Sequence, residues 1–241
     1  MPNTTSTRKL PTQIQISLWE QQLTLLPQRA IWWEEKRFLL LADVHLGKAG
    51  HFRKNGSPIP AAVHWKDLVI LGTLIEIYQP EKVVMLGDLF HSDLNNEWLD
   101  FARWMQQYQP LSFVLVKGNH DILPDAAYDL PQLEVIPEQW QVAPFLFSHK
   151  PIIEPEQKRG GWTFPAISTE TADLYNLAGH VHPGVTVRLG LGQSQRIRCY
   201  FFGKNIGLLP AFGQFTGYVR MNAQPRDQVY GIVSERGIIR V

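Results

Sequence analysis

Three short apolar runs, separated by two helical segments, set the pattern of the first half of the chain. The apolar runs are 38–41, 83–86 and 113–116, and the segments 61–78 and 95–108 between them have helical periodicity. A proline closes each helical segment, at a point where a helix must end. Strand–helix–strand alternation implies a parallel sheet with right-handed crossovers. This half of the chain therefore predicts an α/β sheet.

Shorter strands are expected on both sides of this unit. Residues 14–41 alternate apolar runs with turn-like breaks, which predicts a strand meander. Beyond residue 130, short strands between glycine-rich turns are predicted at 145–147, 174–178, 185–189, 196–202, 230–233 and 238–241. A second sheet packed on the first gives a two-sheet α/β sandwich with helices on the outer faces. Residues 157–168 are predicted to form a mobile loop.

Length and composition are consistent with one soluble domain. We assign residues 1–10 to a flexible N-terminal tail and 11–241 to a single domain. The tail lacks the apolar stretch of a secretory signal, and no run reaches the roughly 20 apolar residues of a membrane helix, which predicts a cytoplasmic protein without membrane contact. The net charge of +1 gives no overall attraction to nucleic acid, so recognition of anions must be local. Cys199 lies in a strand-like run and is expected to be buried and structural.

Five apolar runs end in residues that can bind metal ions. The segments are Asp43-Val44-His45, Gly87-Asp88, Gly118-Asn119-His120-Asp121, Ser148-His149 and Gly179-His180-Val181-His182. The carboxyl ends of strands are where open α/β sheets bind ligands, so these segments are expected to converge. Asp and His supply donors suited to zinc, manganese or iron. A single Asp or His at a strand end is more often a turn residue, but five matching loops favour a metal site.

The order and spacing of these segments resemble the full motif set of the calcineurin-like metallophosphoesterases over residues 40–185. The flanking segments 41–48, 87–92 and 209–217 also resemble the ligase-associated DNA damage response metallophosphoesterases, a family described as endonucleases or phosphodiesterases. This resemblance implies an enzyme that hydrolyses phosphodiester bonds.

The resemblance also implies two divalent metal ions, manganese first, with zinc, iron or nickel as alternatives. One ion would take Asp43, His45, Asp88 and His182, and the other Asp88, Asn119, His149 and His180. Asp88 would bridge the two ions. His120 would stay off the metals as a catalytic residue that protonates the leaving oxygen or stabilises its charge, with Asp121 orienting it. The alternative role for Asp121 is an N-cap of the segment that follows it.

The residues that contact the substrate lie outside these motifs. Arg53 and Lys54 follow the first metal loop and could meet substrate phosphates, although a charged loop is usually just solvated. His91 could lie beside the substrate or serve as a turn or supporting residue. Lys150 and Arg159 are further candidates for phosphate contacts.

The leading hypothesis for function is hydrolysis of phosphodiester bonds by water activated between two metals. DNA is the substrate class that the family resemblance implies; the net charge of the chain does not indicate it. Tight binding of duplex DNA needs several Lys and Arg at phosphates, whereas this chain is nearly neutral. A small or nicked substrate, or a partner protein, would resolve this difficulty. A phosphomonoesterase or nucleotide pyrophosphatase acting on a small molecule is the first alternative. The second alternative is a binding module with a degenerate metal site. Such a module would have lost a ligand residue, whereas this sequence has a candidate at every ligand position. The resemblance also suggests a DNA ligase and a helicase as partners, and edge strands in the C-terminal half leave a homo-oligomer open.

Overall fold

The computed structural model describes residues 12–47, 63–91, 94–153, 156–158, 161–163, 174–190, 193–214, 216–234 and 237–241. The predicted tail, residues 1–10, lies outside the described residues, as do Arg53, Lys54 and Arg159. Among the described helices, none has the length and apolar character needed to cross a membrane.

The first sheet has seven strands in the order β1-β2-β3-β4-β5-β6-β7. Their bounds are β1 Ile14–Leu18, β2 Gln21–Leu25, β3 Ile31–Trp33, β4 Phe38–Leu41, β5 Lys82–Leu86, β6 Ser112–Val116 and β7 Leu133–Ile136. Neighbours from β1 to β4 are antiparallel, and those from β4 to β7 are parallel. The predicted meander and parallel unit are both confirmed.

The second sheet has nine described strands, in the order β16-β13-β14-β15-β12-β9-β8, with β17 on β14 and β18 on β17. Their bounds are β8 Gln139–Val142, β9 Phe145–Ser148, β12 Tyr175–Ala178, β13 Pro183–Gly190, β14 Gln193–Phe202, β15 Ile206–Leu208, β16 Val219–Arg220, β17 Gln228–Ser234 and β18 Gly237–Arg240. The strands predicted in this half of the chain are confirmed, and β8, β15 and β16 are additions.

The mobile loop predicted at 157–168 is wrong for its first part. Strands β10 (Glu156–Lys158) and β11 (Gly161–Thr163) pair antiparallel, with Lys158 opposite Gly161. Gly161 has φ of 148°, a conformation that a residue without a side chain adopts at little cost. Gly161, one of the residues that suggested a loop, therefore lies in a strand. Residues 164–168 lie outside the described part of the chain.

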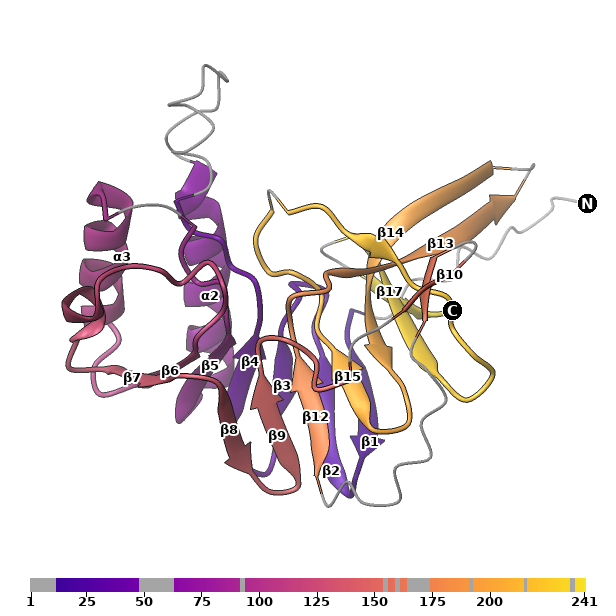
Figure 1. Ribbon diagram of the computed structural model, residues 1–241, viewed down its shortest axis with the longest axis horizontal. Coiled ribbons are helices and arrows are strands. Elements are labelled where there is room, and N and C mark those ends of the chain that lie inside the picture. Colours follow the sequence, from indigo (N-terminus) through magenta and orange to yellow (C-terminus); the bar gives the residue numbers. More distant parts are fainter. Residues whose placement is uncertain are drawn as a thin grey trace, which may run out of the picture.

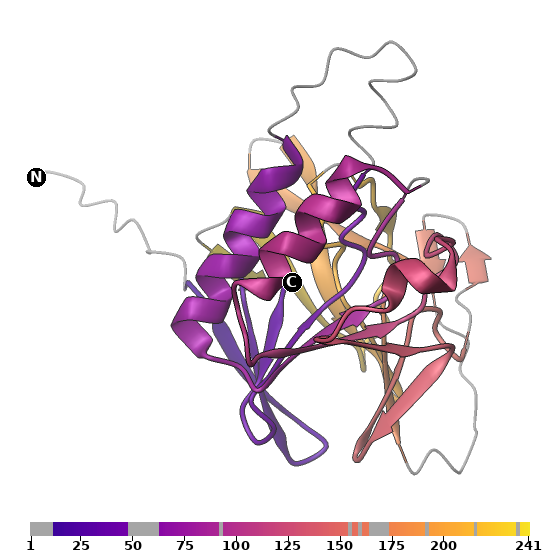
Figure 2. The ribbon, with the colours of Figure 1, turned by 90° about the vertical axis from the view of Figure 1, so that its left-hand side faces the viewer.

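The two sheets lie face to face, with both described helices on the outer face of the first sheet (Figure 1). The helices are α2 (Val63–Tyr78) and α3 (Asn96–Gln106), which run side by side across that sheet (Figure 2), and a 3-10 turn spans Asp125–Tyr128. Asn95 caps α3 because its side chain accepts a hydrogen bond from Glu97 N at 2.8 Å. The two-sheet α/β sandwich is confirmed.

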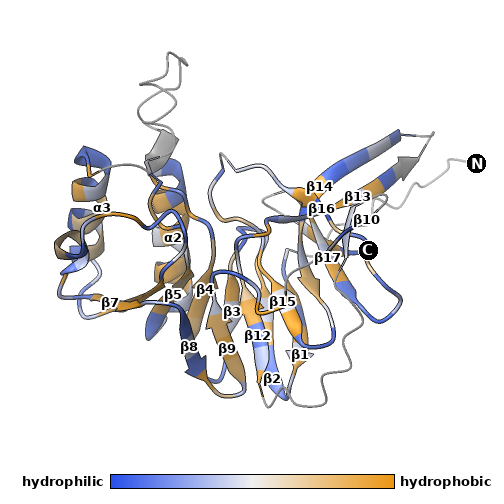
Figure 3. Cartoon of the chain, viewed as in Figure 1, coloured by the Kyte–Doolittle hydropathy of each residue, from blue (hydrophilic) through white to orange (hydrophobic). Residues whose placement is uncertain are grey.

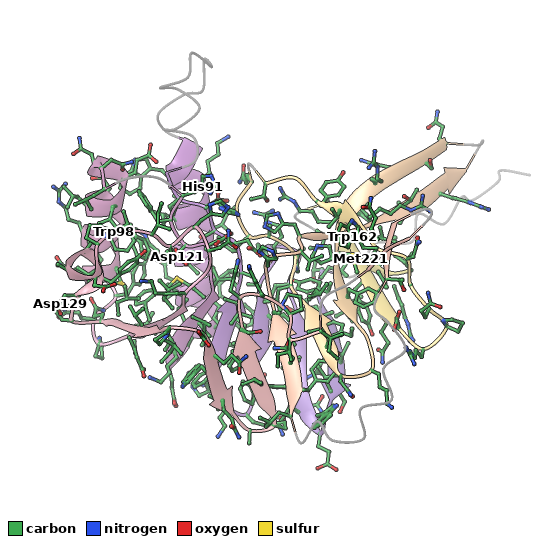
Figure 4. The ribbon with its side chains drawn as sticks, viewed as in Figure 1. His91, Trp98, Asp121, Asp129, Trp162 and Met221 are labelled. Atoms are coloured by element: carbon green, nitrogen blue, oxygen red, sulfur yellow. The ribbon has the colours of Figure 1, made fainter. Side chains whose placement is uncertain are left out.

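Three apolar clusters hold these layers together. Leu71, Trp98 and Phe101 belong to the cluster between the helices and the first sheet, and Trp33 and Tyr200 to the cluster between the sheets. The third cluster lies on the outer face of the second sheet, where helices were expected. There, strand side chains pack with Trp162 and Met221, which lie together in Figure 4. Described helices cover one outer face instead of two, because hairpins replace helical crossovers in the second half of the chain.

Candidate metal centre

The predicted ligands lie at the carboxyl ends of strands in both sheets. Asp43 and His45 follow β4, Asp88 follows β5 and Asn119 follows β6, which are parallel neighbours in the first sheet. His149 follows β9, and His180 and His182 follow β12, which are parallel neighbours in the second sheet. Parallel strands bring their carboxyl ends to one side, marked by His91 and Asp121 in Figure 4. The site therefore lies where the two sheets meet.

The donor atoms form two adjacent groups. Asp43, His45 and His182 make one group, and Asp88, His149 and His180 make the other; within each, the donor atoms lie within 4.8 Å of one another. Asp88 lies between the groups, with Oδ1 3.3 Å from His149 Nε2 and Oδ2 3.7 Å from His45 Nε2. Each oxygen of this carboxylate therefore faces a different group.

Asn119 joins the second group through its contact with His149. Asn119 Oδ1 lies 3.1 Å from His149 Nε2, and His149 Nδ1 lies 3.0 Å from Leu86 O. An Nδ1–H that donates to this carbonyl leaves the Nε2 lone pair directed at Asn119 and Asp88, as a metal ligand requires. All seven predicted ligand positions therefore come together in one place.

Three glycines make room for this packing. A β-carbon at Gly87 would overlap the ring of His149, and one at Gly118 would overlap the carboxylate and backbone nitrogen of Asp88. A β-carbon at Gly179 would lie 2.7 Å from Asp43 Oδ2. These distances are shorter than any side chain tolerates, so glycine at these positions allows the ligand loops to approach one another.

Five of the predicted ligands have a positive backbone φ, a conformation that residues other than glycine rarely adopt. The φ values are 53° for Asp43, 51° for His45, 50° for Asp88, 66° for His180 and 50° for His182. Such strain persists where the surroundings hold it. Here the loops hold one another: His45 N donates to Asp88 O at 2.8 Å, and Asp43 N donates to Gly87 O at 3.1 Å.

Partial burial favours the neutral form of one predicted ligand. It lowers the pKa of His180, as does neighbouring His149, while Asp43 and Asp88 act in the opposite direction. A neutral imidazole is the form that binds a metal. Lys150, predicted as a phosphate contact, is exposed on the rim and contributes weakly to the same lowering.

His120 and His91 border the open side of the site. The side chain of His120 is 43% exposed, and its Nε2 lies 4.0 Å from Asp88 Oδ2, outside both donor groups. Its ring centroid lies 4.0 Å from that of His91, which in turn lies 5.1 Å from that of His45. The sequence allowed His91 to lie beside the substrate or to serve as a turn or supporting residue. In the structure its ring lies beside the donor groups.

Asp121 makes contacts different from those expected. Its Oδ1 accepts from Phe90 N at 3.1 Å and its Oδ2 from Gly118 N at 2.8 Å, so the carboxylate faces two backbone segments instead of the ring of His120. It is buried, and burial raises its pKa to about 6 against the opposing effect of these two hydrogen bonds. Asp121 therefore joins the Asp88 loop to the Asn119 loop, a role that neither sequence interpretation gave it.

Residues 212–214 and Thr216, which we call the brace segment, support the Asp43 loop. Phe212 N donates to Ala42 O at 2.8 Å, and Gly213 N donates to Asp43 O at 3.1 Å. Buried Arg29 donates through Nε to Phe212 O at 2.8 Å and lies 3.7 Å from Asp67.

The other end of the brace segment is held as well. Asp67 Oδ2 accepts from Gln214 N at 3.2 Å, and Arg198 donates to Gln214 O and Thr216 O at 2.9 Å. Sequence reasoning missed Arg29, Asp67 and Arg198 as support for the site, although an aspartate within the apolar run of α2 is a signal that could have drawn attention to a buried partner.

Residues 36–197 match the family model of the calcineurin-like phosphoesterases. The chain belongs to this family. Among solved structures, a nuclease from Pseudomonas putida, nuclease MPE, is 28% identical, with a TM-score of 0.73 over 95% of this chain and 100% of that one. The YfcE phosphoesterase of E. coli is 15% identical, with a TM-score of 0.42 over 85% and 97% of the two chains. A search of the curated proteins found no match.

The family assignment confirms the predicted resemblance. Members of this family bind divalent metals, and the donors gathered here, carboxylate and amide oxygens with four imidazoles, are of the types that such metals take.

Proposed function

We propose that this metallophosphoesterase hydrolyses phosphodiester bonds in DNA with two divalent metal ions, of which manganese is the first expectation. The observation that carries the proposal is the position of Asp88, whose two oxygens face two separate donor groups. The likeness to a nuclease over 95% of the chain supports a phosphodiester substrate.

The two donor groups divide the ligands of the proposed ions. Asp43, His45 and His182 would hold one ion, and Asn119, His149 and His180 the other, with Asp88 shared. When bound, such a pair of ions polarises the phosphate and lowers the pKa of water. The carboxylates of Asp43 and Asp88 are buried and would partly neutralise the charge of the ions.

His120 is the residue we propose as proton donor to the leaving oxygen. It stands outside the donor groups, yet its N–H donates to Asp88 Oδ1 at 2.9 Å, which fixes its backbone to the shared ligand. Its half-exposed ring lies against that of His91, outside both donor groups. Asp121 would act as a positioning residue, because it holds the loops on both sides of His120.

A substrate panel tests the proposal. Turnover of bis-p-nitrophenyl phosphate, p-nitrophenyl phosphate, and single- and double-stranded DNA would be measured with added manganese, with Asp88→Asn as the control. We expect hydrolysis of the diester and of DNA. Activity confined to the monoester would contradict the proposal and favour the phosphomonoesterase alternative. Activity that survives in Asp88→Asn would come from a contaminant.

We further propose that the enzyme works in the cytoplasm, in DNA repair beside a ligase and a helicase. The resemblance of the flanking segments 41–48, 87–92 and 209–217 supports this proposal. Co-purification of the native protein with such partners would test it.

A further inference from the structure

A hairpin that leaves the metal centre has two chemically different faces. Strand β13 begins at Pro183, directly after the ligand His182, and pairs antiparallel with β14. Figure 1 shows the two strands extending together beyond the sandwich. Val185, Val187 and Ile197 are buried in the third apolar cluster. Because side chains alternate along a strand, the residues between them lie on the opposite face.

That opposite face carries arginines. Arg196 lies opposite Thr186, and Arg188 opposite Ser194, so their side chains project from the same face. Arg220 of β16 lies opposite Gly184 in parallel register, which adds it to that face. All three arginines are exposed, and Figure 3 shows hydrophilic residues along the outer part of β14. We call Arg188, Arg196 and Arg220 the arginine face.

An aromatic ring lies at the inner end of this face. Tyr218 packs over Gly184, where a β-carbon would overlap its ring, and its hydroxyl donates to Arg196 O at 2.8 Å. Tyr218 as a whole is 37% exposed. Val219 N donates to His182 O at 3.0 Å, so Tyr218 stands one residue from a backbone bond to a metal ligand. Arg198, on the same side, is held by the brace segment and supports this end of the face.

The strands that carry the arginine face supply no acidic side chain to offset its charge. Strands β13, β14 and β16 contain no Asp or Glu, whereas the chain as a whole carries a net charge of +1. From His182 to Arg188 is six residues, or about 20 Å at roughly 3.3 Å per residue. A row of cations and an aromatic ring over such a length matches the backbone and bases of a polynucleotide strand, and exceeds what a small nucleotide needs.

We infer that the arginine face with Tyr218 binds the backbone of a polynucleotide strand whose scissile phosphate lies at the metal centre. This inference rests on the proposed function and extends it to a substrate several nucleotides long. Phosphates on one side of the cleaved bond lie along the hairpin. The local row of arginines accounts for nucleic-acid recognition by a nearly neutral protein.

The test compares a long and a small substrate. Cleavage of a fluorescent 20-nucleotide DNA strand and of bis-p-nitrophenyl phosphate would be measured for the wild type, Arg188→Gln/Arg196→Gln and Arg188→Lys/Arg196→Lys. We expect the ratio of kcat/KM for DNA to kcat/KM for the diester to fall about tenfold or more in the glutamine variant and to be largely retained with lysine. Thermal unfolding would verify that these exposed substitutions leave the fold intact.

Salt dependence and a matched control complete the test. The affinity for the DNA strand would be measured against salt concentration in the Asp88→Asn background. The plot of log affinity against log salt should become less steep by about 0.7 for each arginine removed. Arg103→Gln should change neither quantity, because this side chain is 72% exposed on α3, a helix that lies at the opposite end of the molecule from β13 and β14 in Figure 1. An unchanged ratio and slope in the glutamine variant, with DNA still cleaved by the wild type, would overturn the inference and leave the proposed function standing. A wild type that cleaves the diester but not DNA would overturn both.

Discussion

The backbone N–H of His180 points at both carboxylate oxygens of Asp43, at 3.1 and 3.0 Å. The two residues are 137 positions apart and belong to loops of different sheets. A ligand of the second donor group thus fixes the carboxylate of the first through its backbone. The two groups are therefore mechanically coupled, and a disturbance of one loop should reach the other.

Substituting Gly118 by alanine should weaken metal binding. The added methyl group would take the space of the Asp88 carboxylate, so we expect manganese affinity, measured by titration calorimetry, to fall about tenfold or more. Gly217→Ala is the matched control, because its β-carbon would meet no atom within 4 Å. Equal affinities of the two variants would contradict the steric role of Gly118.

Removing the ring of His120 should separate catalysis from metal binding. His120→Ala is expected to keep its metal content and to lose about 10²- to 10⁴-fold in kcat, the range for a general acid. His149→Ala should lose metal instead, since its Nε2 lies 3.3 Å from the shared ligand Asp88. Metal content and turnover, measured on the same preparations of both variants, would distinguish loss of the proton donor from loss of the metals. Loss of metal from His120→Ala with normal residual activity would refute the assignment.

The substitution Asp121→Asn should destabilise the protein. Both carboxylate oxygens accept backbone N–H groups, and an amide can accept through one oxygen, so a buried donor would lose its partner. The expected loss is about 1–3 kcal/mol in the free energy of unfolding, measured with urea. A variant as stable as the wild type would show that the loops adjust without this carboxylate.

Removing only Arg29 from the Arg29–Asp67 pair should lower the free energy of unfolding more than replacing both residues with apolar ones. Arg29→Met removes the guanidinium that lies beside buried Asp67, and we expect a loss of about 3–5 kcal/mol in unfolding free energy. The double variant Arg29→Met/Asp67→Leu should recover part of that loss. If Arg29→Met and the double variant both unfold with the same free energy as the wild type, the brace segment is held without this pair.

Cys199 should be inert in the folded protein. Burial raises the pKa of its thiol well above the usual value, so the reactive thiolate is scarce at pH 8, and the side chain is also shielded from reagents. Ellman's reagent is therefore expected to react after denaturation in guanidinium but not with the native protein. Rapid reaction of the native thiol would contradict its place in the core.

The sequence was informative where each residue's environment follows from its neighbours in the chain. The runs 38–41 and 83–86 are apolar throughout because their strands are buried on both faces, and the ligands follow those strands directly. Strand β8 was missed because Gln139–Val142 alternates exposed and half-buried residues and is short. The position of Arg29 against Asp67 and Phe212 could not be read, since no local pattern links residues so far apart.

The seven candidate ligands come from both sheets, four from the first and three from the second. A nascent chain therefore cannot assemble the site until residue 182 has been synthesised and the sheets have docked. Metal uptake becomes a late event of folding and a sensitive report of its completion. Two separately produced halves, divided between β7 and β8, would regain metal affinity to the extent that they reassociate.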